Sequence, residues 1–226
     1  MHIKQHIPNF LTCCNLLCGC VGLVWLYEGD VEVAVYLIWL ALVFDFLDGF
    51  VARLLRVHSP MGKELDSLAD LITFGVLPSF ILYKMLQQQE VDAWVPYLAF
   101  LVAVFSAIRL AKFNIDENQQ TVFIGLPTPA NAIFISSLIF VDGSYPSLLS
   151  YPVLLIITIL FSYLLVSPME LFALKFKDFG WKGNEVRFSF ILFSALSLLF
   201  FLHLALPMIV MMYILLSFFV KIISTT

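Results

Sequence analysis

Four aspartates lie within stretches of sequence that are otherwise almost entirely apolar. Asp45 and Asp48 are close together near the end of one apolar segment, and Asp66 and Asp70 are close together near the start of the next. Residues three or four positions apart share one face of a helix. Two antiparallel helices could therefore direct two carboxylates each toward a common point.

Such a cluster needs compensation, because a charged side chain at the centre of a membrane helix costs about 2.5–3.5 kcal/mol on insertion scales. Either some carboxyls are protonated, or divalent cations complete the site. Carboxylate oxygens suit Mg²⁺ or Mn²⁺, and two such ions sharing carboxylates can hold a phosphoryl group during its transfer. A helix cap, a salt bridge and a proton or cation relay are alternatives that the aspartates alone leave open.

The composition determines which elements must position these acids. The chain has 226 residues, of which 62% are hydrophobic and 12% charged, which is typical of an integral membrane protein built from helices. We expect a single all-α membrane-embedded domain over residues 1–226, forming a bundle of about eight transmembrane helices. The expected segments are 10–28, 33–55, 65–87, 93–113, 125–141, 150–167, 187–203 and 206–224.

The basic residues predict how this bundle is oriented. If the N-terminus is cytoplasmic, every Lys and Arg except Lys84 falls on the cytoplasmic side, as the positive-inside rule requires. This predicts a multi-pass protein of the cytoplasmic (inner) cell membrane with both termini in the cytoplasm. Asp48 precedes Arg53 by about 8 Å of helix at 1.5 Å per residue, so the acidic site should lie near the cytoplasmic face.

A mixed basic and aromatic stretch, KFKDFGWKGNEVRF, occupies residues 175–188. This pattern predicts a strip at the membrane surface that contacts anionic lipid. Because the strip is short and adjoins two apolar segments, we expect no nucleic-acid partner.

The spacing of the acids resembles a known family signature. The matching positions are Asp45, Asp48, Gly49, Ala52, Arg53, Gly62, Asp66 and Asp70, and the signature is that of the CDP-alcohol phosphotransferases. The resemblance implies a six-helix core followed by a C-terminal hairpin at about 187–224. It also implies two Mg²⁺ or Mn²⁺ ions bound by the four aspartates, Asp70 as general base, and a possible homodimer.

The same resemblance suggests which residues bind the nucleotide-lipid donor. Gly49, Ala52, Arg53 and Gly62 match positions that line the pocket for the CMP moiety and the diphosphate. Ser59 is similar to a small hydroxyl residue that contacts the donor. The stretch IPNFLTCCN resembles the family's N-terminal P-N-x-x-T segment, which adds Asn9 and Thr12. Ser59 could instead be a plain loop residue, and Thr12 could cap the first helix.

Three further stretches resemble the phosphatidylserine synthases within this family. They are DSLADLITFGVLPSF (66–80), IRLAKFNID (108–116) and FIGLPTPANA (123–132). Thr73, Lys112 and Asn131 replace a Ser, an Arg and an Ala of the usual pattern. The resemblance implies transfer of the phosphatidyl group from CDP-diacylglycerol to L-serine, with release of CMP.

Serine carries a carboxylate and an ammonium group that the protein must recognise. Arg109 and Lys112 could hold the carboxylate, and Asn114 and Asn131 could orient the amine. Both basic residues could equally mark topology or contact membrane lipid phosphates. A different acceptor, such as glycerol phosphate or inositol phosphate, is the main alternative, and an ion-coupled transporter is a second.

Overall fold

The computed structural model describes residues 4, 6–57, 59–115, 123–171, 180 and 184–225. Most of these residues are helical. The elements, in chain order, are α1 (His6–Glu28), α2 (Val31–Leu55), α3 (Pro60–Asp70), η2 (Leu71–Val76), α4 (Leu77–Gln87), η3 (Val95–Phe100), α5 (Leu101–Ile115), β1 (Phe123–Ile124), α6 (Thr128–Ser144), η4 (Pro146–Leu148), α7 (Tyr151–Val166), β2 (Glu170–Leu171), α8 (Glu185–Phe201), η5 (Leu202–Leu204) and α9 (Ala205–Thr225).

The predicted all-α membrane fold is confirmed. Each expected apolar segment corresponds to one helical rod of the described chain, because α3, η2 and α4 join into one rod and η3 continues into α5. Four rods among the described residues are long and apolar enough to cross a membrane, namely His6–Glu28, Val31–Leu55, Pro60–Gln87 and Val95–Ile115. Tyr151–Val166 and Ala205–Lys221 are shorter apolar helices.

The rod that carries Asp66 and Asp70 begins earlier than the sequence pattern predicted. It starts at Pro60 and not at residue 65, because the Ser59 side chain accepts a hydrogen bond of 3.2 Å from the Gly62 backbone N–H. The backbone N–H at the first helical position has no acceptor within the helix, so proline, which lacks this N–H, loses no hydrogen bond there. Pro60 therefore suits the start of the helix. Asp66 and Asp70 therefore lie within the helix and do not open it.

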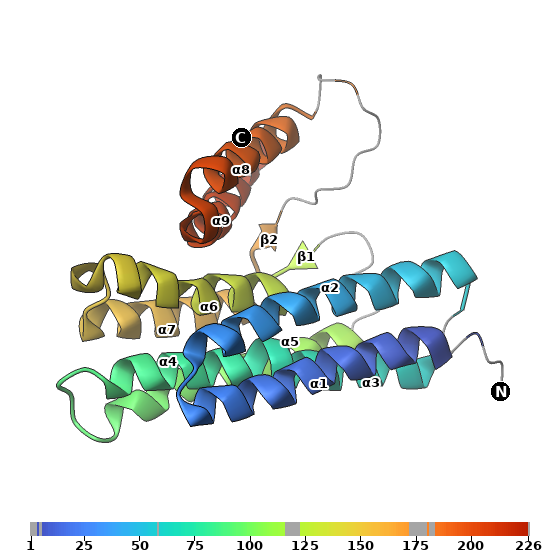
Figure 1. The fold of residues 1–226 in the computed structure, drawn as a ribbon. Helices are drawn as coiled ribbons and strands as arrows, with labels where there is room; N and C mark the ends of the chain where they lie inside the picture. Colours follow the sequence, from blue (N-terminus) through green and yellow to red (C-terminus); the bar gives the residue numbers. More distant parts are fainter. Residues whose placement is uncertain are drawn as a thin grey trace.

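The helices of the N-terminal part pack closely. α1 contacts both α2 and α3, and α5 contacts η2 and α7. Figure 1 shows α1 and α2 running along one side of the bundle, with the hairpin of α8 and α9 standing away from the other helices. Within the described chain, α9 is the helix of this hairpin that packs against α6.

A short antiparallel strand pair joins two connections of the bundle. Phe123 pairs with Leu171 and Ile124 pairs with Glu170. Gly125 follows with φ +74°, and a Cβ there would lie 2.6 Å from the Leu165 carbonyl oxygen. Glycine is therefore required at the turn that leads into α6.

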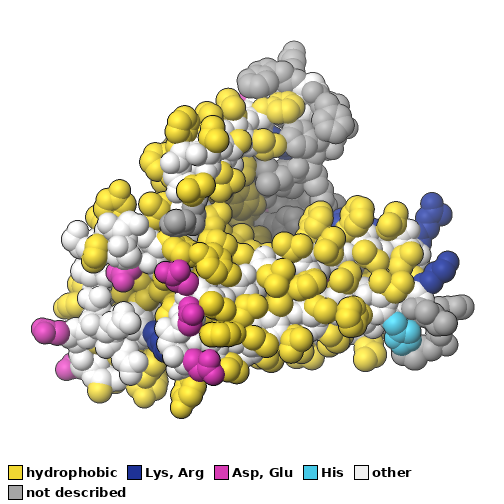
Figure 2. Space-filling view, in the orientation of Figure 1, with side chains coloured by type: hydrophobic (Ala, Val, Ile, Leu, Met, Phe, Trp, Pro, Cys, Tyr) yellow, Lys and Arg dark blue, Asp and Glu magenta, His cyan; other side chains and the backbone are white. Residues whose placement is uncertain are grey.

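The surface agrees with burial in lipid. Figure 2 shows hydrophobic side chains covering most of the visible face of the bundle. Basic side chains gather mainly at the end where α1 begins and α2 ends, whereas acidic side chains gather at the opposite end. Residues 175–179 and 181–183 of the predicted surface strip lie outside the described residues.

Candidate active site

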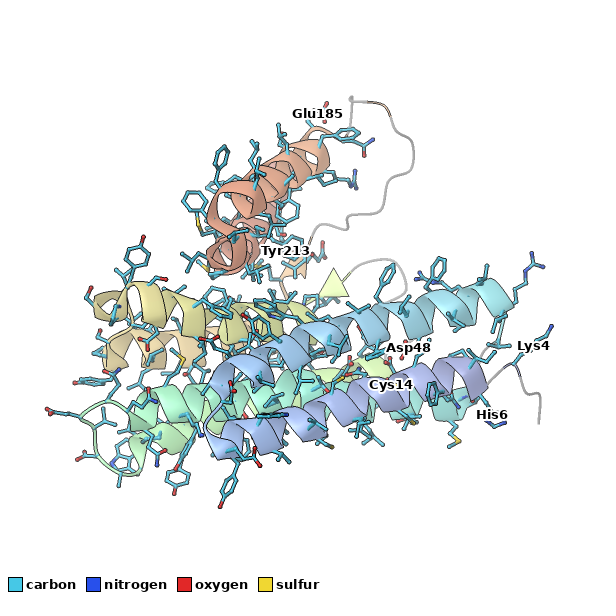
Figure 3. All side chains as sticks on the ribbon, in the orientation of Figure 1. Lys4, His6, Cys14, Asp48, Glu185 and Tyr213 are labelled. Atoms are coloured by element: carbon cyan, nitrogen blue, oxygen red, sulfur yellow. The ribbon has the colours of Figure 1, made fainter. Side chains whose placement is uncertain are left out.

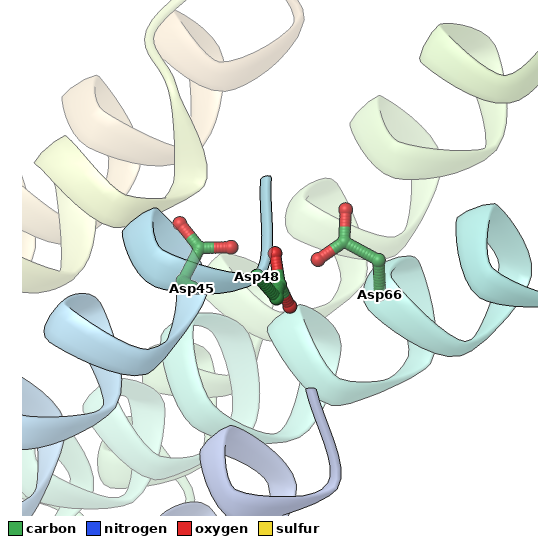
Figure 4. Close-up of side chains that lie close together, drawn as sticks. All are labelled: Asp45, Asp48 and Asp66. Atoms are coloured by element: carbon green, nitrogen blue, oxygen red, sulfur yellow. The ribbon is translucent and has the colours of Figure 1, made fainter. Parts of the chain in front are cut away.

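Three aspartates from two helices converge in the interior. Asp45 and Asp48 lie on α2 and Asp66 lies on α3 (Figure 4). Each offers one carboxylate oxygen, and these oxygens all lie within 4.8 Å of one another. Asp70, one turn beyond Asp66, is 7% exposed, as is Asp48. The spacing argument from sequence therefore predicted correctly that acids of the two helices meet, as Asp45, Asp48 and Asp66 do.

Helix α1 adds side chains that orient two of these carboxylates. The Thr12 hydroxyl lies 2.6 Å from Asp48 Oδ2 and donates a hydrogen bond to it. The Asn15 side-chain amide donates a bond of 3.2 Å to Asp70 Oδ1. Figure 3 shows Asp48 inside the bundle, set back from the end that Lys4 marks. Since Thr12 lies well within α1 (His6–Glu28), the alternative that it caps the first helix is wrong.

An irregular turn lies directly after Asp70. Residues Leu71–Val76 form a π-helix, an element that is often found at functional sites. Thr73, fully buried there, donates a hydrogen bond of 3.1 Å to the Asn15 backbone carbonyl. A Cβ at Gly19 would lie 2.5 Å from the Thr73 hydroxyl oxygen. Glycine at position 19 thus lets α1 approach the π-helix closely enough for Asn15 to reach Asp70.

One cavity of about 240 Å³, here called the α1 pocket, opens beside Asp48 and Asp66. All but one of the residues that the resemblance assigned to the donor nucleotide line its wall. The lining residues of this set are Asn9, Thr12, Gly49, Ala52, Ser59 and Gly62. The exception is Arg53, which is exposed and donates from Nε to the Gly49 carbonyl on its own helix at 3.0 Å. Arg53 lies outside the set of described residues that line this pocket.

The two glycines of the α1 pocket have different roles. A Cβ at Gly62 would lie 2.9 Å from Asn9 Oδ1, so Gly62 allows α1 and α3 to approach each other. A Cβ at Gly49 would meet nothing within 4 Å. Gly49 therefore leaves open space on the wall of the pocket.

A second cavity of about 260 Å³, here called the α5 pocket, also reaches the acids. Asp45, Asp66 and Asp70 line it together with the predicted acceptor residues Arg109 and Asn114. Arg109 Nη1 lies 3.5 Å from the Thr128 hydroxyl, and its buried Nε has no hydrogen-bond partner among the described residues. A guanidinium with a free buried donor beside a cavity is suited to bind an anion.

The other predicted acceptor residues are placed differently. Lys112 is exposed, and Asn131 is fully buried on α6 with neither side-chain polar atom hydrogen-bonded within the described structure. Both lie outside the set of described residues that line the α5 pocket. The Asn114 side chain accepts a hydrogen bond from Ser67 Oγ and donates one to Glu64 Oε2, each at 3.2 Å. Asn114 thus ties the end of α5 to α3.

Sequence reasoning missed two residues that this geometry singles out. Asn15 lies one turn after Thr12 and reaches Asp70, and Lys63 lines both pockets. The available signal was spacing, because Thr12 and Asn15 are three residues apart, as are Lys63 and Asp66. Residues at this separation share a helix face.

The donor set fits divalent cations. Oxygens bound to one Mg²⁺ or Ca²⁺ at about 2.0–2.6 Å lie within about 4–5 Å of each other, which matches the carboxylate cluster. Asp66 Oδ1 is buried and has no hydrogen-bond partner among the described residues. An unpaired buried carboxylate oxygen is costly unless a cation or donor satisfies it. Asp45, Asp48, Asp66 and the adjacent Asp70 could hold such ions between the two pockets.

Comparisons with known proteins show which family the chain resembles. The sequence model of the CDP-alcohol phosphatidyltransferase family matches residues 5–165. A Bacillus subtilis (strain 168) CDP-diacylglycerol--serine O-phosphatidyltransferase is 36% identical over 171 residues, which cover 74% of this chain and 89% of that protein. A Methanothermobacter thermautotrophicus archaetidylserine synthase is 32% identical over 158 residues, which cover 68% of this chain and 66% of that protein.

A third relative is longer than the region of similarity. It is the CDP-diacylglycerol--serine O-phosphatidyltransferase of Mycobacterium leprae (strain TN), 36% identical over 142 residues. The match covers 60% of this chain and 47% of the mycobacterial protein, so the chain spans about half the length of that relative. The match to the family extends over most of the chain and includes both helices that carry the aspartates. The chain belongs to the CDP-alcohol phosphatidyltransferase family.

Proposed function

We propose that this protein is a CDP-diacylglycerol–serine O-phosphatidyltransferase. It transfers the phosphatidyl group of CDP-diacylglycerol to the hydroxyl of L-serine and releases CMP. One observation carries the proposal: the four acids line two cavities that share part of their walls. Asp48 lines the α1 pocket, Asp45 and Asp70 line the α5 pocket, and Asp66 lines both. The bacterial relatives named as serine O-phosphatidyltransferases support serine as the acceptor.

The α1 pocket is the proposed site of the CMP part of the donor. Asn9, Thr12 and Ser59 supply polar atoms, and the open space at Gly49 gives room for a bound group beside Ala52 and Gly62. Arg53 on the outer surface of α2 would have to leave the Gly49 carbonyl to reach the diphosphate. The diacylglycerol tails would lie in the bilayer, against the apolar surface of the bundle.

Two divalent cations, Mg²⁺ or Mn²⁺, would be held by Asp45, Asp48, Asp66 and Asp70, where they neutralise negative charge on the diphosphate and on the departing CMP. The protein's contribution is to fix these carboxylates before substrate binds. Thr12 holds Asp48 and Asn15 holds Asp70. Groups that orient ligands in this way support both metal affinity and activity.

The α5 pocket is the proposed site of serine. Arg109 lines this pocket, and its guanidinium would bind the serine carboxylate. Asn114 would reach the serine amine from the same wall, although its side chain already joins α5 to α3. Lys112 and Asn131, predicted from sequence for this role, could take part from outside the pocket wall.

Proton transfer requires a base on the serine side of the acids. Asp70 lines the α5 pocket, and its carboxylate accepts one hydrogen bond from Asn15. It would take the proton of the serine hydroxyl as that oxygen bonds to the phosphorus attached to diacylglycerol. The bond from phosphorus to the CMP oxygen breaks, and CMP carries away the electron pair of that bond.

The membrane setting supports the same reaction. We infer that residues 1–226 form one domain of the cytoplasmic membrane with both termini and the site toward the cytoplasm. The gathering of basic side chains at the end of the bundle where α2 ends and α3 begins supports this orientation (Figure 2). The homodimer implied by the family resemblance stays a prediction.

The decisive experiment is a product assay with purified protein in detergent micelles. It would supply CDP-diacylglycerol and Mn²⁺ or Mg²⁺ with serine, glycerol phosphate or inositol phosphate in parallel. We expect CMP and phosphatidylserine with serine. Product with a phosphorylated acceptor alone would assign a different acceptor within the family, and no CMP release with any alcohol would remove the enzymatic assignment.

A further inference from the structure

The two pockets share part of their walls. Among the described residues that line them, Lys63 and Asp66 belong to both. On the proposed function, on which this inference rests, the donor occupies one pocket and the attacking hydroxyl approaches from the other. The phosphorus under transfer must therefore lie where the two cavities meet. The shared residues mark that position.

Lys63 is an exposed residue that lines both pockets, and the far end of its side chain is fixed by α5. It lies in the first turn of α3, and its Nζ donates a hydrogen bond of 2.9 Å to the Asn114 backbone carbonyl in the last turn of α5. Carbonyls in the last turn of a helix lack intrahelical partners. A lysine ammonium has three N–H donors, so this contact leaves two for another acceptor.

Hydrogen bonds with Asn114 fix the position of the part of α3 that carries Lys63 and Asp66. Asn114 binds Ser67 and Glu64 through its side chain and Lys63 through its backbone. These three residues occupy the first two turns of α3, which also carry Asp66. The end of α5 therefore holds the part of α3 that carries both Lys63 and Asp66, the two residues that line both pockets.

The charges at the junction show what the ammonium could bind. Asp45, Asp48 and Asp66 bring carboxylate oxygens together there. These acids would repel the anionic phosphate of the donor, and charge on its oxygens and on the departing CMP must be stabilised during transfer. A charged donor aimed at the position of developing charge is the arrangement that lowers such a barrier.

We propose that Lys63 is a catalytic residue that donates a hydrogen bond to a non-bridging oxygen of the phosphate under transfer, while its Asn114 contact holds it between the two pockets. Neither the pattern of aspartates nor the segments that resemble serine-specific relatives assigned this residue a role. The bond forms with the donor bound and strengthens as CMP departs.

The test compares variants in the CMP-release assay with CDP-diacylglycerol, L-serine and Mn²⁺. Lys63→Gln keeps a polar side chain with N–H donors but removes the charge. We expect its kcat to fall by about 100-fold, the scale of losing one donor to a transition state, with little change in KM for serine. Lys63→Arg, which keeps the charge, should recover most of the activity.

Arg56→Gln is the matched control. Arg56 is an exposed basic residue at the end of α2, outside the set of described residues that line either pocket. Arg56→Gln should retain wild-type kcat. This result would show that the fall in kcat of Lys63→Gln is not caused merely by loss of one basic charge at this end of the bundle. Unfolding temperatures with and without Mn²⁺ should be the same for Lys63→Gln and wild type.

Several results would overturn the assignment. Wild-type kcat in Lys63→Gln, an equal loss in Arg56→Gln, or a rise in serine KM with kcat unchanged would each exclude a contact with the phosphate. If Lys63→Gln instead lost its response to Mn²⁺ and Lys63→Arg did not recover activity, Lys63 would be a structural residue only. If the wild type were inactive, both the proposed function and the role of Lys63 would be excluded. If the wild type is active, the variants test the role of Lys63 alone.

Discussion

Thr12 on α1 donates a hydrogen bond of 2.6 Å to Asp48 on α2. This contact joins the N-terminal helix to the acidic cluster on the neighbouring helix. Asp48 contributes one of the three carboxylate oxygens that lie within 4.8 Å of one another. The first helix is therefore part of the candidate site and does more than anchor the chain in the membrane.

The Thr12 hydroxyl gives a first prediction. Thr12→Val keeps the shape of the side chain but removes the donor to Asp48, so the carboxylate loses its fixed orientation. We expect apparent affinity for Mn²⁺, measured as the Mn²⁺ dependence of CMP release, to fall by about 10–100-fold. Thr158→Val is the matched control, because Thr158 is also buried and bonds the Leu154 carbonyl within α7. Equal losses in both variants would exclude a specific role for Thr12.

Asp70 gives a second prediction, which tests the base. Asp70→Asn preserves size and the ability to hydrogen-bond Asn15, but an amide cannot take the serine proton. Serine-dependent CMP release should fall by at least about 100-fold, while the detergent-solubilised protein keeps its circular dichroism spectrum. Asp92→Asn, on the exposed connection between α4 and η3, should behave as wild type. Near-normal turnover in Asp70→Asn would defeat the base assignment.

Removal of divalent cations gives a third prediction. After treatment with a chelator, adding Mn²⁺ at about 100 times its dissociation constant should stabilise the folded protein by about 2.7 kcal/mol. The measurement is the unfolding temperature with and without the ion. Asp48→Asn should lose most of this response because it removes one of the clustered carboxylates, and Asp92→Asn should keep it. A wild type that is indifferent to the ion would argue against a metal site.

Gly49 gives a fourth prediction, in which one substitution weakens donor binding without lowering the stability of the protein. Gly49→Leu places a side chain where a Cβ meets nothing within 4 Å. Leucine is more favourable than glycine within a helix by up to about 1 kcal/mol, so the unfolding temperature of the variant should not fall. The KM for CDP-diacylglycerol should rise because the side chain enters the α1 pocket.

Gly143 provides the control for Gly49. It lies on α6, and a Cβ there also meets nothing within 4 Å. Gly143→Leu should therefore leave the KM for CDP-diacylglycerol unchanged. A similar KM rise in both variants, or unchanged KM in Gly49→Leu, would show that the open space at Gly49 is not the donor site.

Gly19 gives a fifth prediction, in which a substitution at a glycine lowers the stability of the protein. A methyl group at this position would lie 2.5 Å from the Thr73 hydroxyl oxygen and 3.1 Å from Thr73 Cα. Gly19→Ala should therefore destabilise the protein by about 1–3 kcal/mol, the usual cost of overpacking. Turnover should fall as well, since α1 and the π-helix must move apart and Asn15 loses its register with Asp70. Gly143→Ala should do neither, and a stable, fully active Gly19→Ala would contradict the close approach.

Much of the fold could be predicted from local sequence features. Apolar segments of membrane length indicated each rod, because backbone groups in lipid must be bonded within a helix. The start of the third rod was misplaced because residues 60–64 are mostly not apolar, whereas Ser59 and Pro60 supply the cap and the first helical position. The π-helix at Leu71–Val76 had no signal in the apolar pattern.

The sequence by itself determined that Asp45 and Asp48 share one helix face and that Asp66 and Asp70 share another, since periodicity along a helix is a local property. It likewise determined the unequal distribution of basic residues between the ends of the rods. Only the tertiary structure decided that Thr12 and Asn15 hold two of these acids, that Arg53 turns to its own helix and that Lys63 stands between two pockets. Contacts between helices depend on how each is rotated and inclined against its neighbours, and residue spacing within one helix carries no record of that.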